Sequence, residues 1–200
     1  LWILGSQNPL SCAKDANVDH RFASEFGFQS FPNPKTISEI TIPSDRSINS
    51  RVMEHHQRTP NGNINIIQKI LQCLPMPNGF DSTLWASQII QGAAVKHVCE
   101  HFRRNMPKSM GALYWQLNDN WPVASWSSID YSGRWKAMHY MARHFFAPVM
   151  VSGVANLDTG KVDIHLTSDR PKSLQAEITW TATDSKGNLI KNGVIQTITP

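Results

Sequence analysis

The fold is decided by one stretch of sequence, Met110-Gly-Ala-Leu-Tyr-Trp-Gln-Leu117. It is a continuous apolar run of strand length that follows Pro107 and Ser109 and precedes the turn-forming Asn118-Asp-Asn-Trp-Pro122. An apolar run without polar alternation is typical of a strand that is buried on both faces. We therefore expect a buried strand whose end is surrounded by polar and aromatic residues.

A long helix is expected before this strand, over residues 83–104. Its apolar residues recur at four-residue steps in two adjacent rows, which predicts a broad buried face. Asp81 or Ser82 could cap the first turn, because either side chain offers an oxygen to a free backbone N–H. The two rows are Ile90, Ala94, Val98 and Phe102, and Trp85, Ile89 and Ala93.

A second strand is predicted near the start, where Arg21-Phe-Ala-Ser24 forms an extended run that ends at Glu25. Residues 36–74 have helical spacing in pieces, and residues 134–146 have it again after the apolar run. The apolar residues of the first region are Ile64, Ile67, Ile70, Leu71 and Leu74. The order strand, helices, strand, helix fits consecutive βα units of a (β/α)8 barrel, whose active sites lie at the C-terminal strand ends.

Residues 149–200 change to the alternation that is typical of strands with one buried face. Asp184-Ser-Lys-Gly-Asn188 is a hairpin signal between two such runs. We therefore predict an α/β unit, part of a barrel, in residues 1–148, and the beginning of an all-β sandwich in residues 149–200. Residues 1–20 lack periodicity and are expected to be irregular.

Composition excludes several partners. The 200 residues include 19 basic and 15 acidic side chains without a concentrated Lys and Arg stripe, so nucleic acid is not an expected partner. No apolar stretch is long enough to cross a bilayer, so no membrane partner is expected either. Cys12, Cys73 and Cys99 are odd in number and widely spaced, which predicts free thiols. No cofactor is expected.

Glu25 is the candidate catalytic residue. It lies at a predicted strand end beside Phe22, Phe26 and Phe28, and such a carboxyl group could act as a nucleophile or as a general acid/base. On pattern alone, a salt-bridged or helix-capping glutamate is the simpler alternative. The neighbouring His55 and His56 suggest a metal site, but adjacent helical residues do not converge and no third ligand is apparent, so no metal is expected.

Two segments resemble the β-mannosidases of glycoside hydrolase family 2. One is Arg21-Phe-Ala-Ser-Glu-Phe-Gly-Phe-Gln-Ser-Phe-Pro32, which is similar to the family's nucleophile-bearing segment. The other is Gly111-Ala-Leu-Tyr-Trp-Gln-Leu-Asn-Asp-Asn-Trp-Pro-Val-Ala-Ser-Trp-Ser-Ser-Ile-Asp130, which is similar to the eighth barrel strand and its loop. The likeness extends over roughly residues 20–152. It implies the C-terminal portion of a TIM barrel, its last βα units, and the beginning of an immunoglobulin-like β-sandwich.

The resemblance also implies a retaining glycosidase that removes terminal β-D-mannose from β-mannosides, with Glu25 as the nucleophile. Trp115 and Trp121 are expected to stack on the sugar. Gln116 and Asn118 could bind its hydroxyl groups, although strand alternation directs them away from Trp115. The family's acid/base is a Glu that follows an Asn, and no Asn-Glu pair occurs here. The remainder of the parent enzyme is therefore required for a complete site.

Other carboxylates and aromatic residues near the second strand are given structural roles. Asp119 is expected to anchor its loop by hydrogen bonds, and neither Asp119 nor Asp130 is expected to act as the acid/base. Trp126 and Trp135 are expected to be packing residues and not sugar-binding ones. Two alternatives stay open, a non-catalytic carbohydrate-binding or structural fragment and an endo-β-mannosidase that acts on N-glycan cores. The compartment is not indicated by the sequence.

Overall fold

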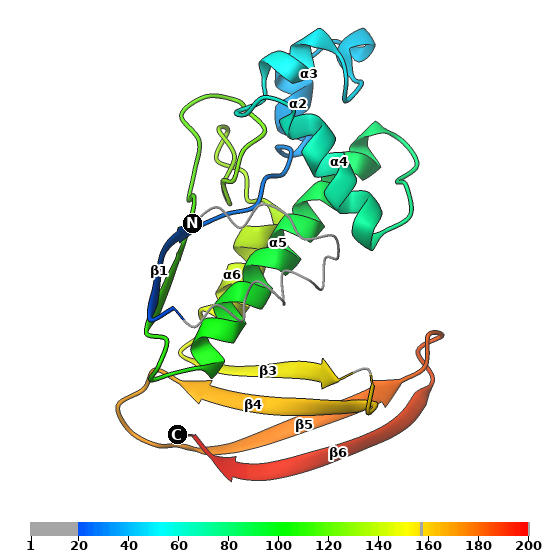
Figure 1. Cartoon of the computed structure of the whole chain (residues 1–200). Helices are drawn as coiled ribbons and strands as arrows, with labels where there is room; N and C mark the ends of the chain where they lie inside the picture. Colours follow the sequence, from blue (N-terminus) through cyan, green and yellow to red (C-terminus); the bar gives the residue numbers. More distant parts are fainter. Residues whose placement is uncertain (1–19, 157, 200) are drawn as a thin grey trace. The chain divides into compact units, whose positions relative to one another are not determined.

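The computed structural model describes residues 20–156 and 158–199, so the irregular segment predicted for residues 1–20 lies outside it except for His20. The chain divides into two compact units, one up to Phe145 and one from Phe146. In the first unit the described elements are β1 (Phe22–Phe26), α2 (Pro34–Ile40), η1 (Pro43–Asp45), α3 (Arg51–His55), α4 (Gly62–Cys73), α5 (Phe80–Arg104), β2 (Gly111–Tyr114) and α6 (Ala137–Phe145) (Figure 1).

β1 and β2 lie side by side as parallel strands, although several helices separate them along the chain (Figure 1). Phe22 pairs with Gly111 and Phe26 with Tyr114, with an irregularity in the register between them. A parallel pair requires a long crossover connection, and here the helices α2 to α5 provide it. The predicted order of strand, helices, strand and helix is confirmed.

The strand β2 is shorter and more open than predicted. It ends at Tyr114, because beyond it Gln116 N–H donates to Trp126 O and the chain enters a loop. The prediction that this strand is buried on both faces is wrong, since Leu113 is 57% exposed. In the described part of the chain β1 is the only strand that pairs with β2, which leaves the other edge of β2 without a strand partner.

The helix α5 begins earlier than predicted and presents a different face. It starts at Phe80 after Gly79, so Asp81 and Ser82 lie within its first turn and do not cap it. The row through Ile90 is mostly buried, as predicted, but the row that contains Trp85 is exposed. The reason is that the polar residues Ser87, Gln88 and Gln91 are buried in its place and bond to the segment after β1.

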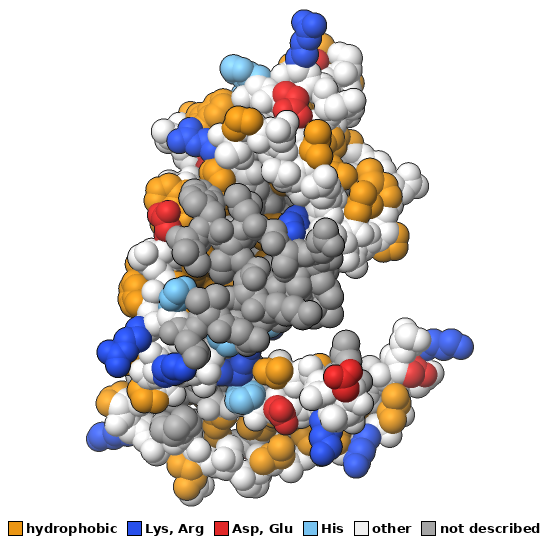
Figure 2. Space-filling model, in the orientation of Figure 1, with side chains coloured by type: hydrophobic (Ala, Val, Ile, Leu, Met, Phe, Trp, Pro, Cys, Tyr) orange, Lys and Arg blue, Asp and Glu red, His pale blue; other side chains and the backbone are white. Residues whose placement is uncertain are grey.

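The main apolar core lies between α5 and the smaller helices. On α4 the large apolar residues that are buried are Ile66 and Ile70, whereas Ile64 and Leu71, predicted for the same face, are exposed. Figure 2 shows apolar side chains at the surface where α4 lies. The cluster consists of Phe31, Ile37, Met53, Ile66, Ile70, Leu84, Ala86, Ile90 and Ala124. It joins the segment after β1 to all these helices.

Two predictions about aromatic and sulfur-containing residues have different outcomes. Trp126 is buried and packs as predicted, whereas Trp135 is 45% exposed and packs with only part of its ring. Trp135 precedes α6 and makes edge contacts with His139 and Tyr140. Cys99 is a free thiol, as predicted, and its burial raises its pKa to about 12. Cys12 lies outside the described residues.

The second unit contains two antiparallel hairpins. The pairs are β3 (Val149–Asn156) with β4 (Lys161–Ser168), and β5 (Gln175–Thr183) with β6 (Leu189–Ile198). The predicted turn is confirmed, because the Asp184 carboxylate accepts from the backbone N–H groups of Lys186 and Asn188. The bond from the Asn188 side chain, together with these backbone bonds, lowers the pKa of Asp184. The sequence did not predict β3, and the assignment of the two units to domain families stays a prediction.

No helix in the described residues combines the length and the apolar character that a membrane span requires.

Candidate active site

The structure brings Glu25 and Trp115 to the same end of the two parallel strands. Glu25 is the exposed residue next to the end of β1, and Trp115 directly follows β2. The backbone N–H of Trp115 donates to Phe26 O at 2.6 Å, which ties the two strand ends together. Because the strands are parallel, both residues lie at their carboxyl ends, as the sequence predicts.

Gly27 permits this close approach. A Cβ atom at Gly27 would lie 2.4 Å from Trp115 O and 2.9 Å from Trp126 Cδ1. Both distances are too short for a real side chain. The backbone after β1 can therefore pass the end of β2 only because residue 27 has no side chain. The Trp115 side chain itself is 45% exposed, and its peptide bond to Gln116 is cis.

Trp121 lies on the loop after β2 and contacts two histidines that the sequence did not connect with it. Its ring stacks on His56 with a centroid separation of 5.7 Å and meets His55 edge-on at 6.1 Å. His56 Nδ1 lies 2.5 Å from Pro122 O, which fixes the imidazole against the same loop. The two histidines that suggested a metal site thus pack against the ring of Trp121.

Asp119 anchors the loop after β2, as predicted. Its carboxylate is buried and accepts from Ser125 Oγ at 2.7 Å, from Ser127 Oγ at 2.5 Å and from Gln116 Nε2 at 3.1 Å. Gln116 Nε2 also donates to Asn118 O at 2.8 Å, so its amide N–H groups are used within the loop. The Asn118 side chain is exposed. Of the two predicted hydroxyl-binding residues, Asn118 is therefore the more accessible.

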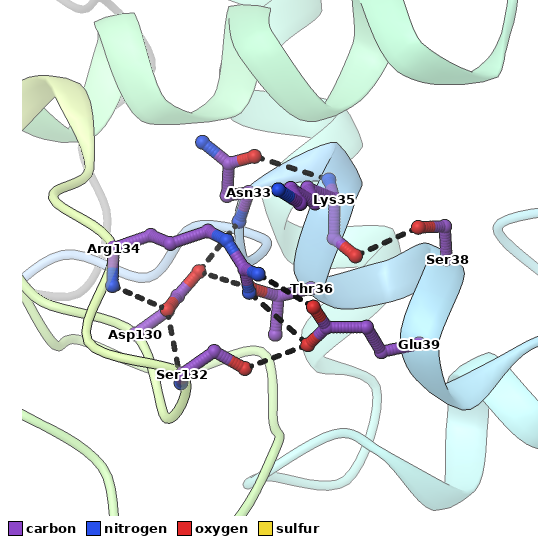
Figure 3. Close-up of polar contacts among 8 residues, drawn as sticks. All are labelled: Asn33, Lys35, Thr36, Ser38, Glu39, Asp130, Ser132 and Arg134. Atoms are coloured by element: carbon purple, nitrogen blue, oxygen red, sulfur yellow. Dashed lines mark hydrogen bonds and ion pairs between the residues drawn. The ribbon is translucent and has the colours of Figure 1, made fainter.

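Asp130 is likewise held inside the structure (Figure 3). Its Oδ2 accepts from Thr36 Oγ1 at 2.6 Å and from Asn33 N–H at 3.2 Å, and its Oδ1 accepts from the N–H groups of Ser132 and Arg134. Four donors in a buried setting occupy both carboxylate oxygens and leave them inaccessible to a substrate. This arrangement agrees with the expectation that Asp130 is not an acid/base.

An exposed ion pair continues the Asp130 cluster to the surface. The Arg134 guanidinium donates to both carboxylate oxygens of Glu39, and its Nη1 also donates to Thr36 Oγ1. The Arg134 and Ser132 hydrogen bonds hold the pKa of Glu39 below its ordinary value. The cluster joins α2 to the segment before α6 (Figure 3).

The buried polar face of α5 holds the segment after β1. Ser87 Oγ accepts from Phe31 N–H at 3.0 Å, and Gln88 Nε2 donates to Phe31 O at 3.2 Å. Gln91 does more, because its Nε2 donates to Phe28 O and to Ser127 O while its Oε1 accepts from Ser30 Oγ. Gln91 thus joins the segments that follow the two strands. Polar residues at this helical spacing are normally expected to face solvent. The supporting role of Ser87, Gln88 and Gln91 was therefore not predicted from the sequence.

Lys136 is fully buried just before α6. Its Nζ lies 3.3 Å from Ser30 O and 3.5 Å from Ser125 O. Burial lowers the pKa of Lys136 to about 8, and the charges of Asp119 and Asp130 oppose that change. The sequence gives no sign of this burial. Among the described residues, no three His, Cys, Asp or Glu side chains gather as metal ligands would.

Comparison with known proteins identifies relatives over most of the chain. It is 38% identical over 178 residues to a β-mannosidase of Bos taurus, with 81% of the chain and 20% of the relative covered. It is 33% identical over 195 residues to β-mannosidase A of Aspergillus fumigatus, with 86% and 21% covered. No family model matches. The chain spans about a fifth of the length of these curated relatives.

Solved structures give the same result. The β-D-mannosidase of Dictyoglomus thermophilum matches with a TM-score of 0.78 and 30% identity, over 96% of this chain and 24% of that one. An exo-chitosanase of Amycolatopsis orientalis matches with a TM-score of 0.70 and 17% identity, over 88% and 22%. The second likeness concerns the fold alone.

Proposed function

Because the chain is a homologue of part of the β-mannosidases and its structural neighbours include a β-D-mannosidase, we propose that it carries the nucleophile half of a retaining β-mannosidase site. Glu25 is the nucleophile. One observation carries the proposal: the hydrogen bond from Trp115 N–H to Phe26 O, which joins the end of the strand bearing Glu25 to an exposed indole. A carboxylate beside an aromatic platform suits attack on a stacked sugar.

The proposed reaction is a double displacement. The Glu25 carboxylate attacks the anomeric carbon, the glycosidic oxygen leaves with a proton from the acid/base, and a covalent mannosyl-enzyme forms. Water then gives its proton to the same acid/base and releases mannose with retained configuration. The substrate is a mannoside or a mannose-containing oligosaccharide.

The second carboxylic acid comes from outside these 200 residues in this proposal. A retaining site needs it about 5 to 5.5 Å from the nucleophile. Asp119 and Asp130 are unsuitable because each is buried and accepts several hydrogen bonds, Asp119 from its own loop and Asp130 from its own segment and from Thr36 on α2. Activity therefore requires the remainder of the parent enzyme.

Trp115 and Trp121 orient the sugar in this proposal, and Asn118 and Gln116 contact its hydroxyl groups. Support comes from the exposure of Trp115 and of Asn118, and from the stack of His56 on Trp121, which reduces the freedom of that indole. An indole that is already held loses little entropy when a sugar binds. Gln116 contributes through its Oε1, since its Nε2 is bonded within the loop.

The architecture that we propose is the end of a (β/α)8 barrel, with β1 and β2 as consecutive strands, followed by the beginning of an immunoglobulin-like β-sandwich. The parallel pairing of β1 and β2 supports it, since the helical crossover between them is typical of βα units. The exposed Leu113 and Trp85 are apolar positions that further barrel elements would cover.

Turnover tests this function in the full natural protein that carries the sequence. We expect hydrolysis of aryl β-mannosides, loss of at least about a thousandfold in kcat for Glu25→Gln, and formation of α-mannosyl azide by Glu25→Ala with azide and a dinitrophenyl mannoside. Azide enters from the face that the carboxylate leaves. Undiminished turnover by Glu25→Gln would remove Glu25 from the mechanism.

Two alternatives are distinguished by the same preparation. An endo-acting enzyme would cleave N-glycan core oligosaccharides internally and leave aryl mannosides intact. A non-catalytic carbohydrate-binding fragment, which the absence of a suitable second carboxylate among the described residues would favour, would bind mannosides without turnover by any variant. Isothermal titration with mannobiose then distinguishes a protein that binds mannosides without turnover from one that does not bind them.

A further inference from the structure

Lys136 is the buried ionisable group that the proposed reaction does not use. Its side chain is completely shielded from solvent, yet its partners are two backbone carbonyls and not a carboxylate. Removing an ammonium group from water is unfavourable unless its surroundings compensate. A buried lysine in this position therefore requires an explanation from the groups around it.

The two carbonyls belong to a bridge between the segments that follow β1 and β2. Ser30 N–H donates to Ser125 O at 2.9 Å, and Ser125 N–H donates to Ser30 O at 3.2 Å. Each carbonyl oxygen has a second lone pair, which faces Lys136 Nζ. Lys136 thus contacts both residues of the Ser30–Ser125 bridge. Among the described residues, this is the only β-bridge that Ser30 forms.

The serine side chains of this bridge are also fixed. Ser30 Oγ donates to Gln91 Oε1 at 2.7 Å, and Ser125 Oγ donates to Asp119 Oδ1 at 2.7 Å. Both serines of the bridge are therefore hydrogen-bonded to buried side chains, and Lys136 is the positively charged one among them. Its removal would leave two buried carbonyl lone pairs without a donor.

The charges that face Lys136 favour the ammonium form. Asp119 approaches from the loop after β2, and Asp130 from the segment before α6, and both attract the cation. Arg134 is directed away, since its guanidinium pairs with Glu39 at the surface. The cation is thus held by two carbonyls at short range and by two carboxylates at longer range.

We propose that Lys136 is a positioning residue: its ammonium group holds the segment after Glu25 against the loop that carries Trp121. This role rests on the proposed function, because the groups that it positions are the proposed nucleophile and sugar platform. Lys136 does not touch the substrate. It acts through Ser30 and Ser125, and through them on the relative placement of the two strand ends.

The test compares Lys136→Met with Lys96→Met in the full natural protein. Both replace a lysine by a side chain of similar length, but Lys96 is half-exposed on α5 and pairs with Glu100, away from the two segments. The measurement is the inactivation of each folded variant by a 2-deoxy-2-fluoro-β-mannosyl fluoride, which labels the nucleophile and needs little acid assistance. Rate constants at saturating reagent report on placement, and half-saturation concentrations report on binding.

We expect the saturating rate constant of Lys136→Met to fall by about tenfold or more, and that of Lys96→Met to stay within about twofold of the unchanged protein. Amide hydrogen exchange at Ser30 and Ser125 should also become faster in Lys136→Met alone. If Lys136→Met does not fold, Lys136→Gln, whose amide keeps two N–H donors but no charge, should show a smaller loss in the same direction.

The two proposals fail in different ways. A normal saturating rate constant in Lys136→Met, or in Lys136→Gln where that is the folded variant, together with labelling of Glu25 in the unchanged protein, would overturn the role of Lys136 alone. Unchanged exchange at Ser30 and Ser125 would do the same. An unchanged protein that is neither labelled nor active on mannosides would overturn the proposed function and the positioning role with it.

Discussion

Gly27 lies where the backbone after β1 passes closest to the end of β2. The space for a methyl group is already filled by Trp115 O and by the buried ring of Trp126. We therefore expect Gly27→Ala to lower the free energy of unfolding by about 1–3 kcal/mol, as overpacking does elsewhere. Denaturant unfolding followed by tryptophan fluorescence measures the change.

Gly153→Ala is the matched control. An added Cβ there would meet its nearest atom, Val162 Cγ1, at 3.4 Å, which is ordinary van der Waals contact. We expect a change smaller than about 1 kcal/mol at this site. Equal losses in the two variants would contradict the close approach at Gly27.

Lys136 gives stability a pH dependence of known sign. Burial lowers its folded pKa to about 8 from 10.5, so the unfolded chain binds more protons between these values. The cost of burying the charge is fully present below about pH 8 and is relieved as the pH rises toward 10.5. Relative to Lys136→Met, the unchanged protein should gain up to about 3 kcal/mol across this window.

Urea unfolding of both proteins at about pH 7.5 and about pH 9.5 should show about 2 kcal/mol of this gain, because the contributions of all other groups cancel between the two proteins. A difference that stays constant with pH would contradict the lowered pKa of Lys136. If the unchanged protein instead loses stability relative to Lys136→Met as the pH rises, the predicted sign is wrong.

At the scale of elements, α5 acts as a hydrogen-bonding support as well as a core helix. Gln91→Met keeps the size of the side chain but leaves Phe28 O, Ser127 O and Ser30 Oγ without their partner. We expect a loss of about 2 kcal/mol or more in the free energy of unfolding, because buried polar groups become unsatisfied. Denaturant unfolding measures it.

Gln72→Met provides the comparison on α4, since Gln72 is exposed and its side chain accepts a hydrogen bond from Lys69 at the surface. The same substitution there should change stability by less than about 0.5 kcal/mol. A small effect at Gln91 would mean that the polar face of α5 does not support the segment after β1.

Sequence periodicity predicted where the elements lie better than which faces they bury. The four-residue row through Ile90 predicted α5 correctly, because apolar spacing is a property of the local sequence. The burial of Gln88 and Gln91 depends on partners in the segment after β1, far away in sequence, and nothing in the helix itself indicates them. Leu113 is the converse case, an apolar residue whose strand pairs on one edge only among the described residues.

At the scale of the whole molecule, the candidate site could be predicted in outline. The strand ends of β1 and β2 carry polar and aromatic residues, so the sequence predicted that Glu25 and Trp115 lie together, and the parallel pairing agrees. The contact of Trp121 with His56 and the burial of Lys136 could not be predicted, because both arise where separate loops meet. The role of Glu25 came from resemblance and stays a proposal.

The most direct measurement is peptide mapping by mass spectrometry after treatment of the full natural protein with a 2-deoxy-2-fluoro-β-mannosyl fluoride. We predict one fluoromannosyl group per molecule, on the peptide that contains Glu25, and none in Glu25→Gln. A folded protein that turns over mannosides but carries the label on another carboxylate would contradict the assignment of Glu25 as the nucleophile.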